Sequence, residues 1–177
     1  ASGAFCSAAE MMTLENEMVS IALGPRGLSQ IHDKQAAHTI HFDSDTFSLT
    51  VNDDVIESAG LAAKRSRRGK TSVVYAYDTG NWTVTVVYEL KQSWRFVSKQ
   101  LTVTSKDGSD YTVKRITLFD GTLRNEIREA FDLSSRRSLQ YGLSLRLKDE
   151  GHRGCFVLVQ NPSTTYLAAG QNISAAY

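Results

Sequence analysis

Alternating apolar and polar positions are the dominant pattern of this chain. Every second residue is hydrophobic in segments 46–51 and 81–88, and the alternation returns in 111–119 and 139–147. Because successive side chains of a β-strand point to opposite faces, a period of two predicts strands with one buried face. The short apolar run 155–159 suits a buried strand.

These segments predict an all-β fold. They are rich in threonine and valine, which fit a pleated, half-buried surface. A glycine-containing turn at 106–110 predicts a hairpin between the alternating segments 101–104 and 111–119. Many short strands separated by turns predict a two-sheet antiparallel β-sandwich over residues 13–177, after a flexible segment at 1–12. The stretch 122–131 predicts either one short helix or an irregular excursion.

The composition is that of one globular domain. The 177 residues match the usual size of a single domain, with 41% hydrophobic and 22% charged residues. The net charge of +1 argues against a nucleic acid partner, because nucleic-acid-binding domains usually carry a clear basic excess. No apolar run is long enough for a transmembrane helix, so no membrane partner is expected.

No catalytic, cofactor or metal motif is evident. Gly69-Lys70-Thr71 lacks the earlier glycine and the following helix of a phosphate-binding P-loop. His38 and His41 have no further ligand nearby to complete a zinc site. Turn formation explains the acidic pair Asp43 and Asp45 more simply than calcium binding. We therefore predict no catalytic residue, no cofactor and no metal.

Two cysteines and two sequons favour an extracellular location. Cys6 and Cys155 either form a disulfide that clips the N-terminal segment to a late strand or remain buried thiols. Asn81 and Asn172 each begin an acceptor pattern for N-glycosylation. Together these features predict a secreted or extracellular glycoprotein.

The sharpest charge feature is a basic run, which comprises Lys64, Arg65, Arg67, Arg68 and Lys70. Its density of positive charge suits phosphate, nucleic acid or an acidic polysaccharide. No aromatic residue lies within the run to stack on a base. The simpler interpretation is a solvated hairpin loop.

Aromatic side chains are the candidates for sugar contact, because a flat ring packs well on the apolar face of a pyranose. Trp94 lies in the turn-like segment 92–95, just before a strand, and is predicted either as an exposed platform or as a core residue. Trp82 alternates with valines and is predicted in the core. Trp94, Arg95, Tyr75 and Tyr77 make up the predicted carbohydrate-binding set.

Several stretches carry a family resemblance. Leu14-Glu15-Asn16-Glu17, followed by Gly27-Leu28-Ser29-Gln30-Ile31-His32-Asp33-Lys34, resembles the opening of the galactose-mutarotase-like β-sandwich (supersandwich) domains found in glycoside hydrolases. Segment 88–103 is similar to their central strands, and 154–162 to their last strands before a catalytic domain. In this opening, Asn16 or Gly27 is expected to adopt positive φ at a tight turn.

The resemblance implies a carbohydrate context rather than a reaction. We expect a non-catalytic module that contacts glycans or supports a neighbouring glycoside hydrolase catalytic domain. One alternative is a secreted structural subunit that assembles with identical subunits through strand addition. The other is a free-standing sugar epimerase or lyase, but the acid and base residues of mutarotases find no matching positions in this sequence.

Overall fold

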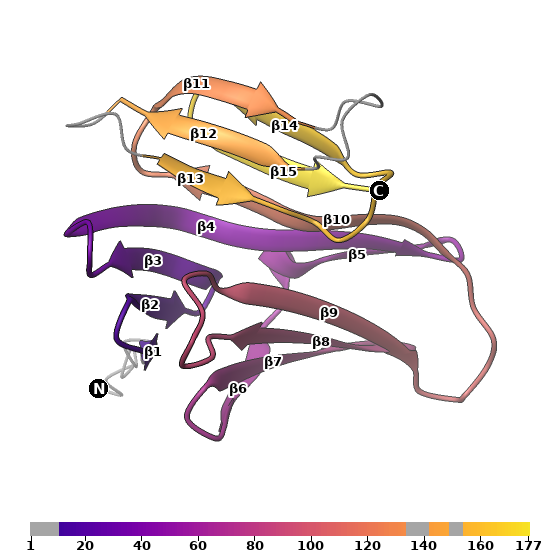
Figure 1. The fold of residues 1–177 in the computed structure, drawn as a ribbon. Helices are drawn as coiled ribbons and strands as arrows, with labels where there is room; N and C mark the ends of the chain where they lie inside the picture. The colour runs from indigo at the N-terminus through magenta and orange to yellow at the C-terminus, as the bar shows by residue number, and fades with distance from the viewer. Residues whose placement is uncertain (1–10, 134–141, 149–153) are drawn as a thin grey trace, which may run out of the picture.

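The chain folds into antiparallel β-structure. The computed structural model describes residues 11–133, 142–148 and 154–177. Within these ranges the strands are interrupted by one helical turn, the 3₁₀ turn η1 (Ser58–Gly60). The strands form one long sheet and two smaller ones (Figure 1). The predicted all-β antiparallel sandwich is confirmed.

The long sheet runs through both halves of the molecule. Its strands in spatial order are β1 (Met12–Glu15), β2 (Val19–Gly24), β3 (Gly27–Asp33), β4 (His38–Val51), β10 (Val113–Leu123), β15 (Asn172–Ala176) and β14 (Thr165–Ala169). A short strand, β5 (Asp54–Glu57), pairs with the last residues of β4. Because β1 begins at Met12, the sheet starts one residue before the predicted boundary at 13, while residues 1–10 lie outside the described part.

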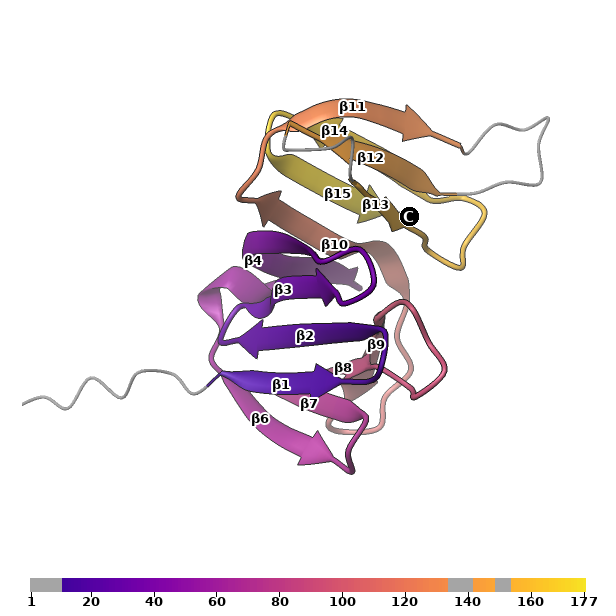
Figure 2. The same cartoon turned by 60° about the vertical axis from the view of Figure 1, so that its left-hand side comes forward.

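The two smaller sheets lie beside different ends of the long sheet. The four-stranded sheet contains β6 (Ala63–Arg68), β7 (Ser72–Thr79), β8 (Trp82–Glu89) and β9 (Ser98–Ser105). The three-stranded sheet contains β11 (Ile127–Asp132), β12 (Leu143–Leu147) and β13 (Gly154–Val157). Figures 1 and 2 show the first near β1 to β4 and the second near β14 and β15.

The first core follows from the alternation. On β8, Val84 and Val86 are buried while the threonines between them are only partly covered, and Trp82 is buried as predicted. The ring of Phe47 on β4 meets the ring of Tyr77 on β7 edge to face, with centroids 5.2 Å apart. Such contacts join the long sheet and the four-stranded sheet into two packed layers.

The second core lies between the three-stranded sheet and the end of the long sheet. Leu143, Leu145 and Leu147 of β12 are buried, as are Tyr166 and Ile173 of β14 and β15. All belong to one continuous hydrophobic cluster with the first core. Alternate apolar residues thus face inward in both halves.

Bulges allow one sheet to serve both cores. The pairing of β10 with β4 shifts register between Thr117 and Asp120 and again between Thr122 and Leu123. Bulges of this kind bend a strand and increase its twist. Alternation alone could not show that the three-stranded sheet is separate from the four-stranded sheet. The bulged pairing of β10 with β4 lies between them, and it joins segments that are far apart in the sequence.

The stretch 122–131 is not helical. Leu123 completes β10 and Ile127 begins β11, with a turn at 124–126 between them. The residues spaced four apart do not share a buried face, since Leu123 is fully buried and Phe131 is 46% exposed. Neither predicted alternative is correct, because most of the stretch lies in the strands β10 and β11.

Candidate functional site

A buried asparagine holds the β8–β9 loop, which carries Trp94. Asn16 lies between β1 and β2 and is 5% exposed. Its Nδ2 donates to the carbonyl oxygens of Lys91 (2.8 Å) and Trp94 (2.7 Å). Its Oδ1 accepts from the backbone N–H groups of Met18 and Val19, each at 2.8 Å. All the hydrogen-bonding capacity of this amide is used, so the loop is fixed to the β1–β2 hairpin.

Two aromatic rings of the β8–β9 loop stack on each other. The centroids of Trp94 and Phe96 are 4.6 Å apart and their planes differ by 18°. Nζ of Lys91 lies 4.6 Å from the indole centroid. Trp94 is half-buried, whereas Phe96 is 56% exposed. Trp94 is thus the support of the pair, and Phe96 is the ring that solvent reaches.

Phe96 was missed by the sequence reasoning. The sequence did contain a signal for Phe96, because residues two positions apart in an extended segment lie on the same side of the chain. Trp94 and Phe96 have that spacing, with Arg95 between them.

Arg95 joins the β8–β9 loop to the turn between β3 and β4. Its Nη2 lies 2.8 Å from Oδ2 of Asp33. Oδ1 of Asp33 accepts the N–H groups of Gln35 (2.9 Å) and Ala36 (3.0 Å). The hydrogen bond from Ala36 and then the contact with Arg95 lower the pKa of Asp33 from its ordinary value. The Arg95–Asp33 ion pair, whose two charges balance, is therefore adjacent in sequence to the two aromatic residues.

Tyr75 and Tyr77 lie in the core, which corrects the prediction that their rings face a sugar. They are 0% and 6% exposed, because both occupy the face of β7 that packs on the long sheet. The Tyr75 hydroxyl donates to the carbonyl oxygen of Gly24 at 2.6 Å. The Tyr77 hydroxyl has no hydrogen-bond partner in the described part of the chain, and its residue lines a pocket.

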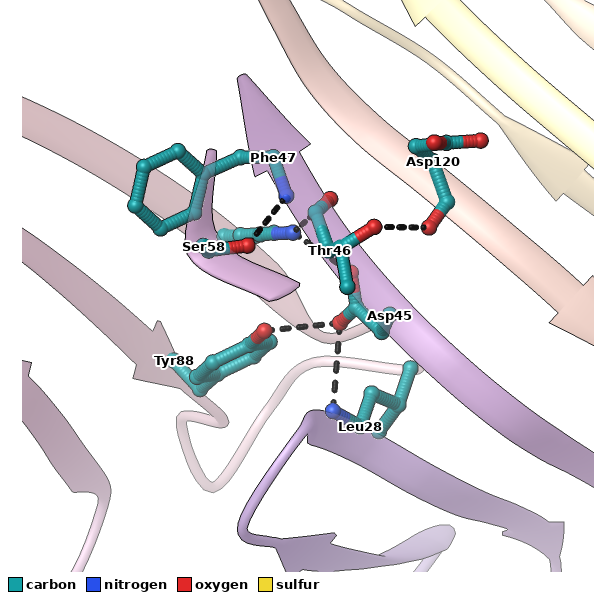
Figure 3. A network of polar contacts seen from close by, with 8 residues as sticks. Leu28, Asp45, Thr46, Phe47, Ser58, Tyr88 and Asp120 are labelled. Atoms are coloured by element: carbon teal, nitrogen blue, oxygen red, sulfur yellow. Dashed lines mark hydrogen bonds and ion pairs between the residues drawn. The ribbon is translucent and has the colours of Figure 1, made fainter. Parts of the chain in front are cut away.

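A buried ion pair lies behind that pocket. Oδ2 of Asp45 accepts from the Tyr88 hydroxyl (2.7 Å) and from the N–H of Leu28 (3.1 Å), as Figure 3 shows. Oδ1 of Asp45 accepts from Nζ of Lys99 at 2.5 Å. The two charged side chains are 0% and 11% exposed. Asp45 was predicted as a turn residue, but it is the point where β3, β4, β8 and β9 are joined.

Tyr88 keeps its proton in this network. Burial, followed by the negative charge of Asp45, raises the pKa of Tyr88 well above its ordinary value. Both oxygens of the carboxylate accept hydrogen bonds from the protein, and the Asp45 side chain is fully buried. The network is an internal anchor of the fold.

Gly27 is required beside this anchor. Its φ of +90° favours glycine, and a Cβ built there would lie 2.6 Å from both the backbone oxygen of Asp45 and the hydroxyl oxygen of Tyr88. The predicted positive φ therefore belongs to Gly27 and not to Asn16. Asn16 serves as the hydrogen-bonding centre of the β8–β9 loop instead.

The basic run forms an edge strand, which corrects its interpretation as a solvated hairpin loop. Its members on β6 are Lys64, Arg65, Arg67 and Arg68, and Lys70 lies in the turn that follows. Arg65 and Arg67 pair with core-facing residues of β7 and lie on the inner side of the strand. Arg67 Nη2 donates to the carbonyl oxygen of Thr13 at 2.5 Å, which connects β6 to β1. Inward-pointing charges of this kind protect an edge strand against pairing with other chains.

Both predicted glycosylation sites are exposed. Asn81 lies in the turn between β7 and β8, and Asn172 begins β15. Oδ1 of Asn172 accepts a hydrogen bond from the hydroxyl of Thr122 at 3.1 Å. Attachment of a glycan at either residue stays a prediction.

Cys155 lies on β13 and is partly buried. Burial raises the pKa of its thiol to about 11. No disulfide is present among residues 11–133, 142–148 and 154–177. Cys6, the predicted partner, lies outside these ranges, so the pairing stays a prediction.

The fold and its surface define the class of this protein as an antiparallel β-sandwich with an anchored aromatic pair. No protein-family model matches the chain, and no curated protein matches it significantly. The described strands and loops bring no three histidine, cysteine or acidic side chains together as metal ligands. No helix in the same part of the chain has the length and apolar character needed to span a bilayer. The functional argument therefore depends on the aromatic pair.

Proposed function

We propose that this protein is a non-catalytic carbohydrate-contacting module, in the manner of the sandwich domains that accompany glycoside hydrolases, and that Phe96 is its principal contact. The observation that carries the proposal is the exposed Phe96 ring, stacked on Trp94 and held by Asn16. A ring that is already ordered loses little conformational entropy when a ligand binds, so its contact area contributes more fully to affinity.

The charges around the ring favour a neutral sugar. Arg95 is paired with Asp33, and Nζ of Lys91 lies 3.9 Å from the carboxylate of Glu89. These pairs leave little net charge beside Phe96 while offering donors and acceptors to sugar hydroxyls. Polar groups of this type fix orientation next to an apolar contact surface.

A glycan array followed by affinity electrophoresis tests the proposal. Wild-type protein is expected to be retained by at least one neutral glycan, and Phe96→Ala to bind it about tenfold more weakly, as expected for a loss of about 1.4 kcal/mol. Phe131→Ala is the matched control, since Phe131 is 46% exposed on β11 in the other half of the molecule. Failure of the wild type to bind any neutral glycan, or equal binding by Phe96→Ala, would reject the proposal.

Strand addition between identical subunits is a second candidate, and the β13 edge favours it. The four residues of β13, Gly154–Val157, carry no charge, and within the described strands β13 pairs only with β12. An uncharged, apolar edge is a template for pairing with another chain. Sedimentation velocity is expected to show a dimer that Val157→Lys dissociates, while Val55→Lys on exposed β5 leaves it intact. A monomeric wild type would rule out this candidate.

A further inference from the structure

The edge strand β6 and the turn that follows it carry the positive charge of this protein in concentrated form. Between Glu57 and Asp78 the sequence has five lysine and arginine residues and no acidic residue. Of the 20 basic residues of the chain, the 15 others are outnumbered by the 19 acidic residues. A local excess of this kind attracts anions even though the net charge of the whole chain is only +1.

Three of these cations form a basic row, which comprises Lys64, Arg68 and Lys70. Lys64 lies opposite Ala76 of β7 and Arg68 lies opposite Ser72, so both stand on the outer side of the four-stranded sheet. Both are exposed, as is Lys70 in the turn before β7. Residues four apart on a strand are separated by about 13 Å. The basic row therefore follows the margin of the molecule that β6 forms in Figure 2.

The basic row has no counter-charge within the part of the chain that the structure describes. None of the ion pairs found there includes one of its three members. The acidic residues on the outer side of the same sheet are Asp78 and Glu89, and each has a lysine partner of its own, Lys106 and Lys91 respectively. The three positive charges are therefore available to an external anion.

The sheet surface beside the basic row carries short side chains. Val74 and Ala76 of β7 are half-buried, and they lie opposite Val87 and Thr85 of β8. No aromatic residue occupies an outward position on β6, β7 or β8, so single-stranded nucleic acid finds no ring on which its bases could stack. A sugar chain suits this surface better, because its C–H groups can contact the methyl groups while its hydroxyls reach threonine.

We infer that the outer margin of β6 binds an anionic polysaccharide, whose sulfate or carboxylate groups contact Lys64, Arg68 and Lys70. Segments rich in lysine and arginine are typical of heparin and nucleic acid sites, and the surface beside this one favours the glycan. The inference is independent of the proposed function, because that function uses Phe96 and a neutral sugar.

Biolayer interferometry of the full chain at several salt concentrations tests the inference. The probes are heparin, polygalacturonate and a thymidine oligonucleotide. Wild-type protein is expected to bind at least one of the two polysaccharides, and to bind the oligonucleotide about tenfold more weakly. Binding of heparin alone assigns the contact to sulfate groups, and binding of polygalacturonate assigns it to carboxylates. Either result supports the inference, whereas no binding to both glycans, or an oligonucleotide bound as tightly as the glycan, would overturn it.

A variant without the basic row locates the contact. The combined substitution Lys64→Gln, Arg68→Gln and Lys70→Gln is expected to weaken polysaccharide binding about tenfold. The slope of log K against log salt should become less steep by about 2, since each lost contact with a flexible polyanion accounts for about 0.7. The substituted side chains are exposed, so the variant should keep the Tm of the wild type.

A matched variant removes three positive charges elsewhere. It combines Lys114→Gln, Arg124→Gln and Lys148→Gln, whose side chains are exposed and paired with acidic residues. Its polysaccharide affinity should stay within about twofold of the wild type, because salt limits the reach of exposed charges to about 10 Å. Equal weakening of both variants would show that net charge alone attracts the glycan and would overturn the inference, as would unchanged affinity of the variant without the basic row.

Discussion

The Asp45 network and the Tyr77 hydroxyl lie beside the same pocket, but their hydrogen bonds are made in different ways. Around Asp45 the carboxylate oxygens accept bonds from Lys99, Tyr88 and Leu28, so the network is complete within the protein. The Tyr77 hydroxyl makes no hydrogen bond within the described structure, and water can reach it. The comparison teaches that polar groups near each other contribute differently to stability: a network completed inside the protein stabilises the fold, whereas a hydroxyl that water satisfies contributes little.

The largest expected effect comes from breaking the completed network. Asp45→Ala leaves Lys99 buried without its counter-charge, and we expect the free energy of unfolding to fall by about 3–5 kcal/mol. Urea denaturation measures this change. Asp43→Ala is the control, because Asp43 forms an exposed pair with Arg124 and should contribute less than about 1 kcal/mol. Equal stability of the two variants would contradict the role given to the buried pair.

The next largest effect is expected at Asn16, whose amide is also completely bonded. Asn16→Ala removes four hydrogen bonds and should lower the free energy of unfolding by about 2–3 kcal/mol, with water replacing part of the loss. Hydrogen exchange of the β8–β9 loop should become faster, because its carbonyl anchors at Lys91 and Trp94 are lost. Asn172→Ala serves as the exposed control. Unchanged exchange in the loop would show that Asn16 does not hold it.

The two core tyrosines of β7 give the sharpest form of the comparison. Tyr75→Phe removes a bond to the carbonyl of Gly24 and should cost about 1 kcal/mol. Tyr77→Phe removes a hydroxyl without a partner in the described chain and should leave stability unchanged or slightly raised. Thermal unfolding of both variants measures the difference. Equal destabilisation would indicate that the Tyr77 hydroxyl is bonded within the protein.

The smallest effect is expected from the exposed pair of Asp33 and Arg95. The pKa of Asp33 is lowered from 3.8 by the N–H of Ala36 and by Arg95. A lowered pKa means that the contribution to stability is present above 3.8 and is lost as the pH falls through the lowered value. The difference in Tm between wild type and Asp33→Asn should therefore be constant near neutral pH and narrow in acid. A difference in Tm that does not narrow at low pH would contradict the contribution of the charged Asp33 carboxylate to stability.

The alternation of residues predicted most of the strands, but it did not show that the tyrosines of β7, which were predicted to contact sugar, face the core. Tyr75 and Tyr77 alternate with Val74 and Ala76, which are only half-buried, so a choice between the two faces needed the position of the long sheet. The basic run gave a clear charge signal, yet its place on an edge strand depends on pairing with β7. Trp94 was recognised as a candidate platform because it lies in a turn-like segment, while its partner Phe96 was not recognised.

The sequence by itself determined that this chain forms antiparallel β-layers, because the period of two is a local property of each strand. It left open whether Asn16 or Gly27 adopts positive φ, and only the structure showed that Gly27 does, with φ of +90°. The tertiary structure alone decided that Asp45 meets Lys99, 54 positions away, and that Asn16 meets Lys91 and Trp94, 75 and 78 positions away. Contacts between such distant residues depend on register and on bulges, which alternation does not encode.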